Sequence, residues 1–128
     1  MRVNRKGFTL IQTLFVFVII GSIAVLIPSQ VNSKVLLRFE CEKLKDYLLQ
    51  AQIEAIENKE QVVVNIEGSS IMINERTISL SNSTMCTTHE ISFNERGNVN
   101  MAQTILCKSA DSQKEIVINL GSGNIYVK

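Results

Sequence analysis

A long apolar segment near the N-terminus constrains this chain more than any other feature of its sequence. Residues 8–27 are almost all apolar, and the exceptions are Thr9, Gln12, Thr13, Gly21 and Ser22. A helix of about 20 residues is about 30 Å long, which matches the hydrocarbon core of a bilayer. A secretory signal has a shorter apolar region, followed by a cleavage site of small residues. The segment is therefore predicted to span a membrane as a helix.

The short leader before this segment is positively charged. It contains Arg2, Arg5 and Lys6, and positive charge on one side of a span keeps that end in the cytoplasm. Removing these three from the 13 basic residues of the chain leaves 10, against 12 acidic residues. The remainder lacks the basic excess that is typical of nucleic-acid-binding domains. We expect a single-pass membrane protein with its N-terminus inside the cell and the rest outside.

The helical pattern changes its character after the apolar segment. Gly21 and Pro28 are predicted to loosen or break the helix, because glycine is flexible and proline removes a backbone donor. Apolar residues then recur at steps of three and four, which predicts an amphipathic helix over residues 28–60. Its apolar stripe contains Val35, Leu36, Phe39, Leu44, Tyr47, Leu48, Ala51 and Ala55. We expect this stripe to pack against the rest of the domain.

From residue 61 onward the pattern indicates short strands. Segments rich in β-branched residues lie at 61–67, 70–75, 77–80, 90–94, 104–107, 115–120 and 124–128. Turn residues separate them, with a hairpin near Gly68 and a turn at Gly97. The predicted fold class is α+β: one long N-terminal helix, made of a transmembrane half and an amphipathic half, packed on a small antiparallel sheet over residues 61–128.

The composition leaves little room for catalysis. His89 is the only histidine, and at the entrance of a strand we expect it to be solvated rather than catalytic. Three cysteines are too few and too far apart for a zinc site. No glycine-rich phosphate loop is present. We expect no enzymatic activity, no metal site and no cofactor.

The cysteines allow two interpretations. Cys86 and Cys107 flank a segment whose turn at Gly97 would bring its ends together. A disulfide between them would close a loop of about 20 residues and stabilise the fold by about 3 kcal/mol in the chain-entropy model. Alternatively, all three cysteines, Cys41 included, are small buried hydrophobic residues. The sequence leaves both interpretations open.

The motif at the start of the apolar segment resembles a known signal. Lys6-Gly7-Phe8-Thr9-Leu10-Ile11, followed by a polar residue and an apolar run, is similar to the type III signal of type IV pilins and pseudopilins. The resemblance implies that a membrane aspartic peptidase removes residues 1–7 by cutting between Gly7 and Phe8 and methylates the new amino group of Phe8. Gly21 and Pro28 fall close to the helix breakers of that family.

The C-terminal half narrows the resemblance. The segments ISFNERGNVNMAQTILC and INLGSGNIYVK are similar to the ComGD-like minor pseudopilins of Gram-positive competence pili and, more distantly, to the H-type minor pseudopilins of type II secretion. The resemblance implies a minor subunit of a DNA-uptake pilus, needed for pilus assembly or initiation and for transformation. Its partners would be the other minor pseudopilins, the major pilin, the prepilin peptidase and the membrane. Its location would be the cell membrane and the surface pilus.

Gln12 departs from the family pattern, which has glutamate as the fifth mature residue. That glutamate is thought to attract the positively charged N-terminus of a neighbouring subunit. Gln12 can accept a hydrogen bond from an ammonium group but cannot neutralise it. Two interpretations follow: a subunit that sits at or near the filament tip, or a tolerated substitution in a subunit recruited through its globular domain.

A second functional hypothesis makes the sheet a DNA-binding module at the pilus tip. Phosphate contacts need only a few well-placed cations, and the candidates are Arg76, Arg96, Lys108, Lys114 and Lys128. Interspersed acidic residues argue against it. So does the scarcity of aromatic residues for base stacking, since Phe93 and Tyr126 are the two in the predicted sheet.

Overall fold

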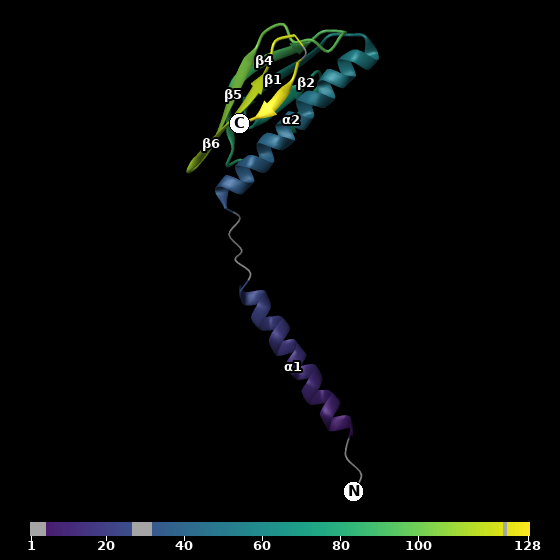
Figure 1. Cartoon of the computed structure of the whole chain (residues 1–128), viewed down its shortest axis with the longest axis vertical. Coiled ribbons are helices and arrows are strands. Elements are labelled where there is room, and N and C mark those ends of the chain that lie inside the picture. The colour runs from purple at the N-terminus through teal and green to yellow at the C-terminus, as the bar shows by residue number, and fades with distance from the viewer. Residues whose placement is uncertain (1–4, 27–31, 122) are drawn as a thin grey trace. The chain divides into compact units, whose positions relative to one another are not determined.

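The computed structural model describes residues 5–26, 32–121 and 123–128, with the side chains of residues 5–8 and 24–26 left out. The chain divides into two compact units, Met1–Val31 and Asn32–Lys128, and each is described by itself (Figure 1). We call the second one the globular unit. Pro28 lies outside the described residues, so its predicted effect on the helix stays a prediction.

Helix α1 (Arg5–Leu26) forms the described part of the first unit. It contains no proline, and it continues through Gly21 without a break. The interruption predicted at Gly21 is therefore absent, because a single glycine costs a helix only about 1 kcal/mol relative to alanine. Within the described residues, no helix combines the length and the apolar character that crossing a membrane requires.

Helix α2 (Ser33–Asn58) begins and ends at recognisable caps. The side chain of Asn32 accepts a hydrogen bond from the backbone N–H of Lys34 at 3.1 Å, which satisfies one of the free donors of the first turn. At the other end, Lys59 adopts a left-handed conformation with a φ of 54°. The amphipathic helix is thus shorter than the predicted range of 28–60.

Seven strands follow α2 and form one antiparallel sheet. They are β1 (Val62–Gly68), β2 (Ser70–Ile73), β3 (Arg76–Ser79), β4 (Met85–Phe93), β5 (Gln103–Ser109), β6 (Ser112–Ile118) and β7 (Ile125–Val127). The strand order across the sheet is β3-β2-β1-β4-β5-β6-β7. Every neighbouring pair is consecutive in the chain except β1 and β4. The predicted α+β class with an antiparallel sheet is confirmed.

The core lies between α2 and the sheet. Helix α2 contacts β1, β4, β5, β6 and β7, and Figure 1 shows it running alongside the strands. Alternate strand residues point toward it and are buried, as the period of two requires. The buried strand residues include Val62, Val64, Ile66, Ile91, Phe93, Ile105, Cys107, Ile116 and Ile118.

The buried stripe of α2 differs in part from the prediction. It consists of Leu37, Cys41, Leu44, Leu48, Ala51 and Ala55, together with Glu40. Val35 and Phe39 were predicted to belong to it, but they are 62% and 64% exposed. Counting back from Leu44 by steps of three and four gives residues 41 and 37, so Val35 and Phe39 belong to a different face of the helix.

Strand boundaries differ most from the prediction in two places. Strand β4 begins at Met85, five residues before the predicted start at residue 90. The β5–β6 hairpin turns at Ala110 and Asp111, so β5 and β6 include most of the stretch between the predicted segments 104–107 and 115–120. In both places the extra strand residues are mostly polar, and their pairing with neighbouring strands outweighs their weak intrinsic preference for strand.

Candidate functional site

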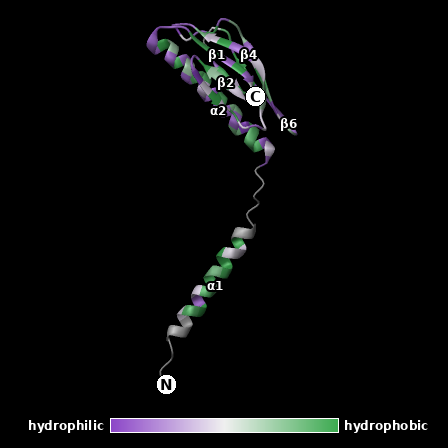
Figure 2. Cartoon of the chain, turned by 180° about the vertical axis from the view of Figure 1, so that it is seen from behind, coloured by the Kyte–Doolittle hydropathy of each residue, from purple (hydrophilic) through white to green (hydrophobic). Residues whose placement is uncertain are grey.

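Helix α1 presents an almost continuous apolar surface. Every side chain described on it, from residue 9 to residue 23, is exposed, and Figure 2 shows most of this helix in the hydrophobic colour. Monomeric soluble proteins rarely expose an apolar patch larger than a few hundred Å². A helix that is apolar all round is normally buried in protein or in lipid. The surface of α1 is therefore the first candidate for an interaction site.

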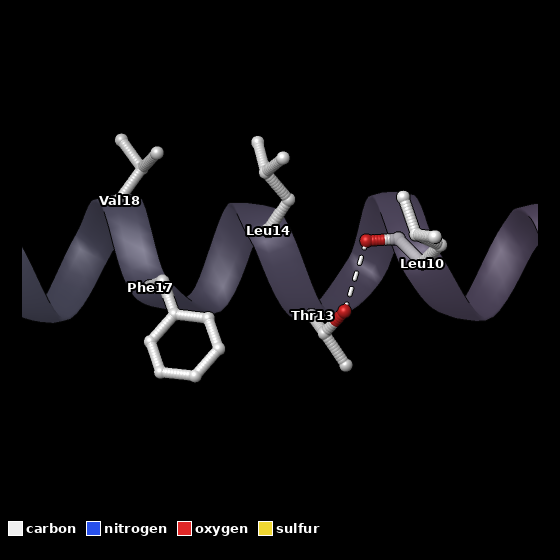
Figure 3. A pocket seen from close by; sticks show the side chains of 5 residues that line it. All are labelled: Leu10, Thr13, Leu14, Phe17 and Val18. Carbon is white, nitrogen blue, oxygen red and sulfur yellow. Dashed lines mark hydrogen bonds between the residues drawn. The ribbon is translucent and has the colours of Figure 1, made fainter.

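The polar groups of α1 differ in how they are satisfied. The hydroxyl of Thr13 donates a hydrogen bond to the carbonyl oxygen of Leu10 at 2.9 Å (Figure 3), and that of Ser22 donates to the carbonyl of Ile19 at 2.8 Å. Such bonds let a hydroxyl enter an apolar environment without an outside partner. The amide of Gln12, by contrast, makes no hydrogen bond to any described residue.

The predicted processing site lies at the start of this helix. Gly7 and Phe8 belong to α1 by their backbone, but the side chain of Phe8 and the burial of both residues are outside the described part. Cleavage after Gly7 and methylation of Phe8 therefore stay predictions. Gly21 lies further along the helix, and a Cβ added there would meet no atom within 4 Å. Nothing in the described part of α1 requires glycine at that position.

Helix α2 carries apolar side chains on the outside as well as on its buried stripe. Val35 and Phe39 are exposed near its beginning, and Ile53 and Ile56 are exposed near its end. Figure 2 shows both hydrophobic and hydrophilic residues along this helix. The outer surface of α2 is thus less polar than a helix that only faces water needs to be, and it is a second candidate interaction surface.

Two cysteines are bonded to each other. Cys86 of β4 lies directly opposite Cys107 of β5, and a disulfide joins them. Both side chains are buried. The third cysteine, Cys41 of α2, is free and buried, and burial raises the pKa of its thiol to about 11. The sequence left open whether Cys86 and Cys107 form a disulfide or are only buried hydrophobic residues, and the structure contains the disulfide.

Beyond the disulfide, side chains hold β4 and β5 together. The paired residues of these strands end at Cys86 and Cys107. Further along, Nδ1 of His89 lies 3.1 Å from Oε1 of Gln103, and Nε2 of His89 lies 2.9 Å from the hydroxyl of Thr87. The Gln103 amide also donates to the carbonyl of Glu90 at 2.8 Å. His89, predicted to be solvated, is instead half-buried in this polar network.

The polar network has no clear signal in the sequence. Thr87, His89 and Gln103 are separated by up to 16 positions, and none lies in a recognisable motif. They lie beyond the last paired residues of β4 and β5, at the part of β4 where its pairing with β1 also shifts register. Side-chain hydrogen bonds, and not a backbone ladder, link β4 to β5 there.

Two glycines lie close to α2 at the other end of the sheet. Gly97 has a φ of +74°, and a Cβ there would lie 2.7 Å from Cδ1 of Ile56. The carbonyl of Gly97 accepts a hydrogen bond from the Gln52 amide at 2.7 Å. Gly123 has a φ of +62°, and its Cβ would lie 2.5 Å from Nε2 of Gln52. The turn predicted at Gly97 is thus also a contact between the sheet and α2.

The five cations proposed for DNA contact do not form one patch. Lys108 and Lys114 lie on opposite faces of the β5–β6 hairpin, because Lys114 is opposite Cys107, the neighbour of Lys108. Arg76 begins β3 at the far edge of the sheet, about 19 Å from β5 at the usual strand spacing. Arg96 lies in the turn before Gly97, and Lys128 lies beside Glu115.

Comparisons with known proteins show a likeness in structure alone. No protein-family model matches the chain, and no curated protein sequence matches it. Two crystal structures of the type IV minor pilin FimU of Pseudomonas aeruginosa are similar, with TM-scores of 0.63 and 0.62 and sequence identities of 14% and 15%. Both alignments cover 72% of this chain, and they cover 87% and 92% of the FimU chains. The chain therefore has a type IV pilin-like fold.

Proposed function

We propose that this chain is a minor pseudopilin, a structural subunit of a type IV pilus-like filament without chemistry of its own. One observation carries the proposal: a fully exposed apolar helix precedes a globular unit in a chain whose fold is similar to that of a minor pilin. The motif Lys6-Gly7-Phe8 at the start of that helix supports it. Neither feature alone would distinguish a filament subunit from an ordinary membrane-anchored domain.

In the proposed mechanism, α1 anchors the subunit in the membrane and then packs among the equivalent helices of other subunits. Lipid tails are as apolar as the side chains of α1, so the exchange of lipid for protein is driven by packing and by polar contacts between helices. Head-to-tail addition of such subunits produces an open helical filament. The exposed apolar residues of α2, such as Phe39 and Ile53, would extend this contact surface beyond the membrane.

The finer assignment is to a competence pilus that takes up DNA. It rests on the resemblance of the C-terminal segments to the ComGD-like group, and it adds as partners the prepilin peptidase acting at Gly7 and Phe8, the major pilin and the other minor pseudopilins. The dispersed positions of Arg76, Lys108 and Lys114 argue against direct DNA binding by the sheet. Any DNA contact is then made by the assembled pilus.

Deletion of the gene tests this assignment. We expect loss of surface pili and of transformation, both restored by the parent gene but not by a Gly7→Ile variant that blocks processing. A Gly21→Ala variant is the matched control, because no described residue contacts that position. Loss of protein secretion with normal transformation would instead indicate an H-type pseudopilin of a secretion system. Pili and both activities at parental levels would contradict a filament role altogether.

A further inference from the structure

One face of α1 has the spacing of a helix–helix seam. Gln12, Val16, Ile19 and Ile23 follow each other at steps of four, three and four, which is the spacing of the a and d positions of a heptad repeat. All four side chains are exposed. Three of them are β-branched and apolar, and the fourth is a polar amide. A single polar residue in such a seam is known to set register and partner.

The surface beside Gln12 has hollows that could accept the side chains of a second helix. Two shallow hollows flank it: one is lined by Ile11, Gln12, Phe15 and Val16, and the other by Gln12, Thr13, Val16 and Phe17. Gln12 and Val16 line both, so they form a ridge between the two hollows. Another helix with the same ridge could place its side chains in these hollows, as in knobs-into-holes packing.

The amide of Gln12 also lacks a partner of its own. Whereas Thr13 and Ser22 donate to carbonyls of their own helix, the Gln12 amide has no hydrogen bond in the described structure. An amide left unpaired in an apolar environment is costly. The side-chain amide has both hydrogen-bond donors and an acceptor, so two such amides can pair with each other. An ammonium group of a partner could bond only to the acceptor, and a carboxylate only to the donors.

We propose that α1 pairs with α1 of a second copy of this chain, in parallel and in register, through reciprocal hydrogen bonds between the two Gln12 amides. We infer the parallel arrangement because it keeps all four seam residues in contact, whereas an antiparallel pair that overlaps along the same seam would place Gln12 near Ile23 of the other copy. A second copy is the fitting occupant because identical helices carry the amide at the same height. The pair does not depend on the proposed pilus function, and it would form in the protein before any assembly.

Self-association of the purified full-length chain in detergent micelles tests this pair. We expect Gln12→Leu to weaken association about tenfold, and Gln12→Asn to retain most of it, because interhelical polar bonds are modest in strength. Thr13→Val is the matched control: it removes a neighbouring polar group that is satisfied within its own helix, and association should not change. Equal association of Gln12→Leu and the parent, or a parent that stays monomeric, would overturn the proposal.

Cross-linking tests the geometry of the pair independently. In a Cys41→Ser background, where the other two cysteines are bonded to each other, we expect Val16→Cys to form a disulfide-linked dimer under mild oxidation. Leu14→Cys lies about 200° around the helix from Gln12 and should not. Equal cross-linking at both positions would mean random collision and would contradict the seam. Neither assay involves pili, so the pair and the filament role can fail separately.

Discussion

Helix α1 leaves all of its described side chains exposed, whereas helix α2 of the same chain buries a continuous stripe against a sheet. Both are regular helices of similar length, 22 and 26 residues. The difference lies in what covers their apolar residues: the sheet does so for α2, and nothing within the described first unit does so for α1. The stability of α2 is therefore internal to the globular unit, and that of α1 depends on its surroundings.

The largest expected effect comes from the buried stripe. Leu44→Ala should lower the free energy of unfolding of the globular unit by about 3 kcal/mol, because it removes a fully buried side chain and leaves a cavity. Leu14→Ala in α1 deletes the same atoms from an exposed position and should change it by less than about 0.5 kcal/mol. Urea unfolding of the full chain in detergent, followed by circular dichroism, measures both. Equal losses would contradict the assignment of Leu14 to an exposed position.

Much of α2 could be predicted from the sequence, and the reason is its regularity. Leu44, Leu48, Ala51 and Ala55 repeat at helical spacing, and all four are buried as predicted. Near the start of α2, two apolar stripes compete, and the sequence prediction chose the wrong one: Leu37 and Cys41 lie inside and Phe39 outside. Extending the regular steps back from Leu44 selects Cys41 and Leu37, and the sheet covers that face.

The polar network and the disulfide show the opposite case. Both depend on the register of β4 against β5, in which Cys86 lies opposite Cys107, and that register is set by the tertiary structure and not by a local motif. The sequence could therefore propose a disulfide between Cys86 and Cys107, but it could not decide between that disulfide and three buried free cysteines. For α1, the sequence showed the apolar segment and the odd position of Gln12, but not which polar groups its own helix satisfies.

The disulfide gives the next largest effect. Replacing both Cys86 and Cys107 with alanine should lower the stability of the globular unit by about 3 kcal/mol, since the bridge spans 21 positions of sequence. Reductant should destabilise the parent to the same level and leave the double variant unchanged. Cys41 provides an internal check: burial raises its pKa to about 11, so at pH 8 it should react with iodoacetamide only after unfolding. A parent insensitive to reductant would contradict the bridge.

Alanine substitutions at two glycines distinguish the cost of a steric contact from the cost of backbone strain. Gly97→Ala should cost about 2 kcal/mol, because its positive φ disfavours alanine and the new Cβ would lie 2.7 Å from Ile56. Gly121→Ala has a positive φ of +85° but no atom within 4 Å of the new Cβ, so it should cost only the strain, about 1 kcal/mol. Gly21→Ala in α1 has neither problem and should instead increase helix content. Equal losses of stability in Gly97→Ala and Gly121→Ala would show that the Ile56 side chain of α2 moves to make room for the added Cβ.

The smallest expected effect lies at the first turn of α2, where the two units meet in sequence. Asn32→Ala removes the side-chain acceptor for the N–H of Lys34 and should lower the stability of the globular unit by about 1 kcal/mol. Asn32→Asp keeps an acceptor and adds a negative charge that the helix N-terminus favours, so it should be at least as stable as the parent. Hydrogen exchange should show the loss in Asn32→Ala confined to the first turn of α2, with α1 unaffected. Faster exchange throughout α1 as well would mean that the two helices unfold together, which would contradict the division of the chain into two compact units.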